Sequence, residues 1–111
     1  MSKQEEQITI NVGLDENNVP DKLSWKASQI DKQNETGAAI LSFWDRKEKS
    51  AMRIDLWDKE FTTDEMKMLI HQTLLTLADS YERATSEKDL SEKMRDFGHF
   101  FGIESGIVQE G

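Results

Sequence analysis

The first half of the chain alternates between apolar and polar residues. A period of two is typical of half-buried strands, and it predicts four of them, over residues 7–14, 23–27, 37–44 and 51–57. The third segment, GAAILSFW, is apolar on both faces, which indicates a central position or cover on both sides. The short turn DRKEKS before the fourth strand favours an antiparallel hairpin.

Two polar segments separate the predicted strands. Residues 15–21, DENNVPD, are rich in turn formers and contain the only proline, Pro20. Residues 28–35 are polar except for Ile30. Both segments are therefore expected to be connections.

The hydrophobic period becomes helical in the second half of the chain. Thr62 and Glu65 have the spacing of a capping box, which marks the start of a helix. Ser86 is a second N-cap candidate, and its helix is expected to end near Gly98 or Gly102. The first stripe is wide enough to lie on a sheet. The apolar positions are Met66, Leu69, Ile70, Leu74, Leu77, Tyr81 and Ala84 in the first helix, and Leu90, Met94, Phe97 and Phe101 in the second.

This order of elements favours an α+β fold. Four strands followed by two helices are most simply arranged as a four-stranded antiparallel sheet with the helices packed on one face, in two layers. A length of 111 residues suits one domain. We expect an ordered core over residues 7–102 and a loose C-terminal tail over residues 103–111.

Composition excludes several classes of protein. The chain is 36% hydrophobic and 32% charged, as in globular proteins. No apolar run approaches the roughly 20 residues of a membrane-spanning helix, and the N-terminus does not resemble a secretory signal. The absence of cysteine excludes disulfides, thiolate catalysis and cysteine-ligated metal. These features favour a cytoplasmic protein without membrane insertion.

The charge balance argues against nucleic acid as a partner. The chain has 22 acidic and 14 basic residues, a formal net charge of −8. Such an acidic protein repels a phosphate backbone.

The sequence offers no metal or cofactor site. His71 and His99 are isolated and lack the i, i+4 partner of a helical metal site, so His71 is interpreted as a surface or interface residue. Asp15 opens a segment that begins like a calcium loop, but Pro20 replaces the required glycine and Lys26 the bidentate glutamate. We therefore expect a turn there and no bound cofactor.

Arg53, Asp55 and Trp57 share one face of the fourth predicted strand. Together with Trp25 or Trp44 they would line a small recessed site, in which the carboxylate serves as acid or base. No second carboxylate, serine–histidine pair or glycine loop supports an enzyme. An ion pair on a packed sheet face is the preferred interpretation.

Met68 and Leu75 form a second apolar patch on the first helix, opposite the main stripe and flanked by His71. Two such residues one heptad apart on a polar face indicate a docking or self-association seam. Packing of the second helix against this face is the alternative. The predicted partner-binding residues are Met68, His71, Leu75, Arg53, Asp55 and Trp57.

Five segments resemble the gliding motility-associated protein GldC family of the Bacteroidota. They are VGLDENNVP, RIDLWDKEF, DEMK, HQTLLTLADSYERAT and MRDFGHFF, and in this order the resemblance covers residues 8–101. It implies a small accessory protein of surface gliding that works alongside a lipoprotein, with no assigned catalytic residue. The expected function is therefore non-enzymatic and rests on contacts with protein partners of the gliding machinery.

A weaker resemblance concerns architecture. Four antiparallel strands followed by helices, in an acidic protein, are similar to the export chaperone SecB, which forms oligomers and holds unfolded clients. This likeness implies a homo-oligomer and a holding function for exported motility proteins, although fold does not determine function. A small ligand-binding or enzymatic domain that uses the sheet face is a further alternative.

Overall fold

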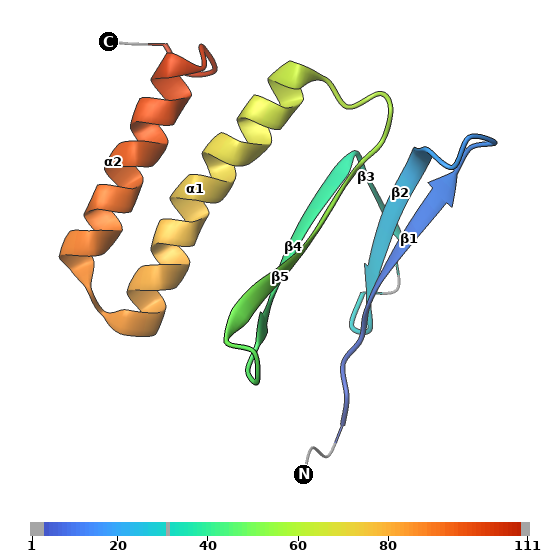
Figure 1. The fold of residues 1–111 in the computed structure, drawn as a ribbon, viewed down its shortest axis with the longest axis horizontal. Coiled ribbons are helices and arrows are strands. Elements are labelled where there is room, and N and C mark those ends of the chain that lie inside the picture. Colours follow the sequence, from blue (N-terminus) through green and yellow to red (C-terminus); the bar gives the residue numbers. More distant parts are fainter. Residues whose placement is uncertain (1–3, 31, 110–111) are drawn as a thin grey trace. The chain divides into compact units, whose positions relative to one another are not determined.

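The computed structural model describes residues 4–30 and 32–109, which form five strands and two helices (Figure 1). The α+β class is therefore confirmed. The chain divides into two compact units, Met1–Phe61 with the strands and Thr62–Gly111 with the helices. The expectations of one domain and of helices layered on the sheet stay predictions.

Three antiparallel strands form the first sheet, in the order β1-β2-β3. Their bounds are β1 Ile8–Leu14, β2 Pro20–Ala27 and β3 Asn34–Thr36. Ile10 lies opposite Trp25 and Val12 opposite Leu23, so the alternating apolar residues of β1 and β2 share a face. Leu23 is 1% exposed and lies at the centre of this unit's small core.

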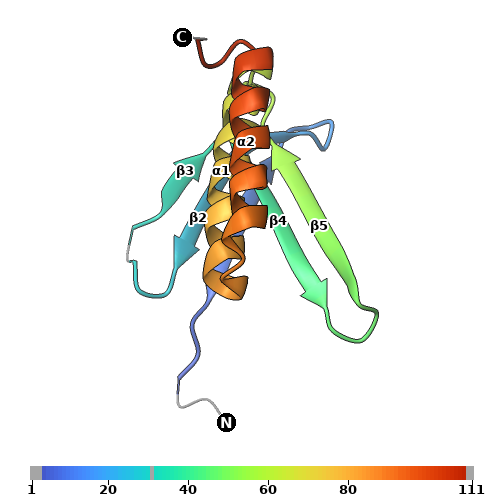
Figure 2. The ribbon, with the colours of Figure 1, turned by 90° about the vertical axis from the view of Figure 1, so that its left-hand side faces the viewer.

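The second sheet is a hairpin of two antiparallel strands, β4 (Ala38–Asp45) and β5 (Ser50–Trp57), visible as a ribbon in Figure 2. The prediction of a single four-stranded sheet is therefore wrong. Asn34–Thr36, expected to be part of a loop, pairs with the free edge of β2. That edge is consequently not available to β4, which pairs with β5 alone among the described strands.

The first helix, α1 (Thr63–Thr85), begins as the sequence predicts. Thr62 Oγ1 accepts a hydrogen bond from the Glu65 N–H at 3.1 Å, and the Glu65 carboxylate accepts one from the Thr62 N–H at 3.0 Å. The capping box is thus confirmed. It satisfies two of the N–H groups that a helix start leaves without partners.

The second helix, α2 (Lys88–Glu104), begins later than predicted. Ser86 ends α1 instead of capping α2: its φ is 61° and its N–H donates to the Glu82 carbonyl at 2.8 Å. A residue in the left-handed region ends a helix and reverses the chain. Only Glu87 then separates Ser86 from α2, and the two helices run side by side as a hairpin (Figure 1).

Gly98 and Gly102 lie within α2, which ends at Glu104, close to the predicted end near Gly102 and beyond the one near Gly98. Both are buried, and a Cβ added to either would lie 2.7 Å from α1 atoms, Leu75 Cδ2 and His71 Nε2 respectively. These glycines therefore serve close packing of the two helices rather than chain termination.

The chain stays ordered for a few residues beyond 102, whereas the expectation of a loose C-terminal tail stays a prediction. The helix continues to Glu104, and the Val108 N–H then donates to the Gly102 carbonyl at 3.0 Å. This hydrogen bond brings Val108 back to the last turn of α2. Residues 110–111 lie outside the described part.

Candidate protein-contact surfaces

The β4–β5 hairpin exposes apolar side chains on one face. Its register places Phe43 opposite Met52 and Leu41 opposite Ile54. Phe43 is 54% exposed, Met52 61% and Ile54 48%. Ala39 and Leu56 form a third pair beside them. We call these six residues the apolar face of the hairpin.

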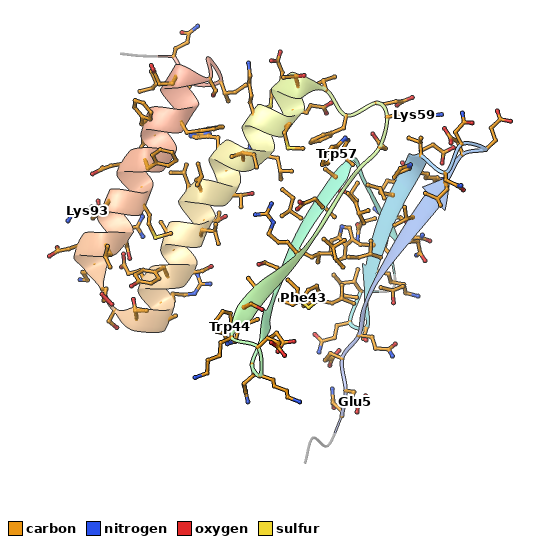
Figure 3. All side chains as sticks on the ribbon, in the orientation of Figure 1. Glu5, Phe43, Trp44, Trp57, Lys59 and Lys93 are labelled. Carbon is orange, nitrogen blue, oxygen red and sulfur yellow. The ribbon has the colours of Figure 1, made fainter. Side chains whose placement is uncertain are left out.

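The opposite face of the hairpin combines aromatic and charged groups. Trp44, at 65% exposure, lies across from Ala51, and Trp57, at 50%, lies across from Ala38. Figure 3 marks Phe43 and Trp44, which follow each other along β4 and so belong to opposite faces. Large apolar side chains are therefore accessible on both faces.

Arg53 and Asp55 form the expected ion pair, with Arg53 Nη2 3.3 Å from Asp55 Oδ2. Their side chains are 62% and 38% exposed, so the pair lies on a solvated face and not on a packed one. Ion pairs of this kind contribute little to stability.

An open hollow of about 290 Å³ lies beside β5. Asp55 and Trp57 line it, as the sequence hypothesis of a recessed site required, whereas Arg53, Trp25 and Trp44 do not. The remaining lining residues are Val19, Pro20, Leu56, Asp58 and Lys59. Within residues 4–30 and 32–109, no group of three or more histidine, aspartate or glutamate side chains is placed to hold a metal ion.

Lys59, at the rim of this hollow, is held by Asp15 from the turn after β1. Lys59 Nζ lies 3.0 Å from Asp15 Oδ2, while Asp15 Oδ1 accepts hydrogen bonds from the N–H groups of Asn17 at 2.8 Å and Val19 at 3.0 Å. These contacts, the Val19 N–H first, hold the pKa of Asp15 below its ordinary value, and Asp15 in turn raises the pKa of Lys59. Asp15 thus organises a turn, as predicted.

The helical residues predicted to bind a partner fall in two environments. His71 and Leu75 lie against α2, next to Gly102 and Gly98 respectively, so packing of the second helix accounts for them. Met68 is 42% exposed and remains accessible. Their role in partner binding stays a prediction.

An arginine network joins the two helices. Arg95 on α2 contacts carboxylates of Asp79 at 2.9 Å and Glu82 at 3.0 Å, both on α1, and Glu92 at 2.6 Å on its own helix. These carboxylates, Asp79 first, raise the pKa of Arg95 further above its usual range. The network was not foreseen because Asp79 and Glu82 are distant from Arg95 in sequence.

Comparison with known proteins shows to which family the chain belongs. A family described as "Gliding motility-associated protein GldC-like" matches residues 20–106. The chain belongs to the GldC-like family. The resemblance found in the sequence is therefore confirmed, whereas the likeness to SecB stays a prediction. No curated protein and no solved structure matches the chain significantly.

The region matched to the GldC-like family runs from β2 to the end of α2. It therefore includes both faces of the β4–β5 hairpin and the helical hairpin with its accessible Met68. Neither described helix of this GldC-like protein has the length and hydropathy to cross a membrane.

Proposed function

We propose that this GldC-like protein is a non-enzymatic, cytoplasmic accessory component of gliding motility that acts by binding protein partners of the gliding machinery. The observation that carries the proposal is the β4–β5 hairpin, which leaves Phe43 and Met52 accessible on one face and Trp44 on the other. Exposed contiguous apolar surface of this kind marks interaction sites in folded proteins. Family membership supplies the biological context.

The chemistry of the hairpin suits protein recognition. Aromatic side chains and methionine are enriched at protein interfaces, where they provide large contact areas. The Arg53–Asp55 pair beside Trp44 and Trp57 gives this surface a polar element for orientation. Met68 offers a second, smaller contact on α1.

The experiment that tests the proposal is a mild cross-linking pull-down of the tagged protein from gliding cells, read by mass spectrometry. We expect one motility component at near-stoichiometric yield, and we expect Met52→Glu, on the apolar face of the hairpin, to lose it. Lys47→Glu, in the adjacent turn, is the matched control and should retain the partner. Equal recovery of motility components from an untagged strain would contradict the proposal.

A second candidate function is that of a SecB-like holding chaperone for exported motility proteins. Wide exposure of large apolar residues on a chain with a net charge of −8 favours it, because such a protein stays dispersed while it offers apolar surface to clients. The GldC-like protein would then suppress light scattering when a denatured protein is diluted into buffer. Unchanged scattering at equimolar concentration would count against this function.

A further inference from the structure

The four edge strands of the two sheets differ in how they are protected against pairing with another chain. Exposed edges template association, and proteins prevent it with short strands, charges or bulges. The first sheet ends in β3, which has three residues, and in β1, whose pairing shifts register between Gly13 and Leu14. In the second sheet, β5 carries Arg53 and Asp55. Three of the four edges are therefore protected.

The fourth edge, β4, has neither a short length nor a register shift, and its one charged residue, Asp45, is the last residue of the strand. Residues 38–44, AAILSFW, contain no charge, proline or glycine, and β4 keeps an unbroken register with β5 over eight residues. Half of the main-chain groups of such a strand point away from its single partner. No other described strand pairs with them.

The side chains of β4 are also graded by size along the strand. Ala38 and Ala39 stand at one end, and Phe43 and Trp44 at the other. When such a strand meets a copy of itself in the antiparallel direction, each aromatic residue falls opposite an alanine. The hairpin already uses this arrangement, since Trp57 lies across from Ala38 and Trp44 across from Ala51.

We propose that β4 pairs with β4 of a second copy of this chain, antiparallel and centred on Leu41. Leu41 then faces Leu41 of the second copy, Phe43 faces its Ala39, and Trp44 faces its Ala38. The product is one four-stranded sheet in the order β5-β4-β4-β5 with two-fold symmetry, the commonest symmetry of homo-oligomers. The role in motility does not depend on this pairing.

The pairing makes the apolar faces of the two hairpins continuous. Each copy contributes Ala39, Leu41, Phe43, Met52, Ile54 and Leu56 to this face. Asp45 shares the face by strand alternation and lies at the end of β4. On the other face, Trp57 lies beside Trp44 of the second copy, above Ala38. The charged pair Arg53–Asp55 stays on β5, away from the new junction.

The area involved indicates a reversible dimer. Phe43 and Trp44 are 54% and 65% exposed, which amounts to roughly 250 Å² of aromatic surface per copy. A standard interface covers about 800 Å² per partner. The main-chain edge of β4 adds to the aromatic surface, so the interface falls in the small, dissociable class.

The register is tested by disulfide trapping in this chain of 111 residues, which contains no cysteine. Leu41→Cys should form a covalent dimer under mild oxidation, because residues directly opposite in an antiparallel pair have Cα atoms about 4.5–5.5 Å apart. Ala39→Cys alone should not, since its copies are offset by four residues, about 13 Å. Phe43→Cys alone should not either, for the same reason.

A mixture of the last two variants separates this register from any other. Ala39→Cys mixed with Phe43→Cys should give a covalent heterodimer, in severalfold higher yield than either variant gives alone. Circular dichroism of each variant confirms that it is folded. The proposal is overturned if folded Leu41→Cys yields no more dimer than Ala39→Cys, or if the mixture yields no more than its components. Recovery of a motility partner in the pull-down would still support the proposed function if this pairing were overturned, so the two proposals are tested independently.

Discussion

Lys59 Nζ lies 3.0 Å from a carboxylate oxygen of Asp15, which ties the segment after β5 to the turn after β1. Asp15 is the more enclosed partner, with 16% of its side chain exposed. Because Asp15 also accepts two main-chain N–H groups of its own turn, one carboxylate fixes both the turn and its attachment to the second sheet.

Substitutions at Asp15 should separate these two roles. We expect Asp15→Ala to lower the urea midpoint most, because it removes the turn hydrogen bonds and the ion pair together. Lys59→Met should have a smaller effect, since the turn hydrogen bonds remain. Chemical denaturation monitored by tryptophan fluorescence measures both. Equal shifts of the urea midpoint in the two variants would show that the turn hydrogen bonds do not contribute to stability.

The Asp15 contacts should also make stability depend on pH. The pKa of Asp15 is lowered in the folded protein from its ordinary value of 3.8. A lowered pKa means that its stabilising contribution is fully present above pH 3.8 and is lost as pH falls through the folded pKa. The urea midpoints of the wild type and Asp15→Asn should therefore differ at neutral pH and converge in acid. A difference that stays constant down to the lowest pH would contradict this assignment.

A Cβ at position 98 should destabilise the helical hairpin. The added atom would lie 2.7 Å from Leu75 Cδ2, whereas alanine alone would favour the helix by about 1 kcal/mol. We expect the crowding to exceed that gain and Gly98→Ala to cost roughly 1–3 kcal/mol of unfolding free energy. Thermal unfolding followed by circular dichroism at 222 nm measures this change in unfolding free energy.

A double-mutant cycle provides the control for this clash. In a Leu75→Ala background the space next to residue 98 is open, so Gly98→Ala should cost much less there. The same cost in both backgrounds would show that the Leu75 contact is not its origin.

Removal of Arg95 should weaken the contact between α1 and α2. Arg95→Met keeps most of the side-chain volume but leaves the carboxylates of Asp79, Glu82 and Glu92 without their shared cation. We expect a clear drop in melting temperature, larger at low salt, where like charges repel over longer distances. Lys93→Met is the matched control, because Lys93 is exposed on the same helix. Similar drops in both variants would argue against the network.

The helix start gives a simpler prediction. Thr62→Ala removes the side-chain acceptor of the capping box and should cost about 1 kcal/mol of unfolding free energy. Thr63→Ala, one position later and exposed, should change stability by less than about 0.5 kcal/mol. The comparison of urea denaturation curves tests whether the cap observed here is formed in solution.

The sequence predicted features that depend on neighbouring residues and missed those that depend on distant ones. The Thr62 cap and the hairpin of β4 and β5 were foreseen because local spacing determines them. β3 was missed because Asn34–Thr36 joins the sheet through main-chain pairing with β2 and has no apolar alternation. Gly98 suggested a helix end because the position of α1 beside it is not visible in one dimension.

The residues of the candidate site were likewise predictable only where their relationship depends on neighbouring residues. The Arg53–Asp55 pair could be predicted, since strand alternation places both side chains on one face. Leu75 was identified as apolar, but only the structure shows that α2 lies against it. The solvent exposure of Phe43 and Trp44 could not be predicted either, because an apolar strand normally indicates burial.

Small residues occupy several positions of the seam between the helices. Ala78 and Ser91 are fully buried there, together with Gly98 and Gly102. The two glycines leave room for Leu75 and His71 of α1, whereas Phe97 and Phe100 remain more than half exposed. The helix pair therefore buries small residues and exposes two of its aromatic ones. Phe97 and Phe100 are free to contact a surface beyond the helix pair, while the small residues let the two helices approach closely.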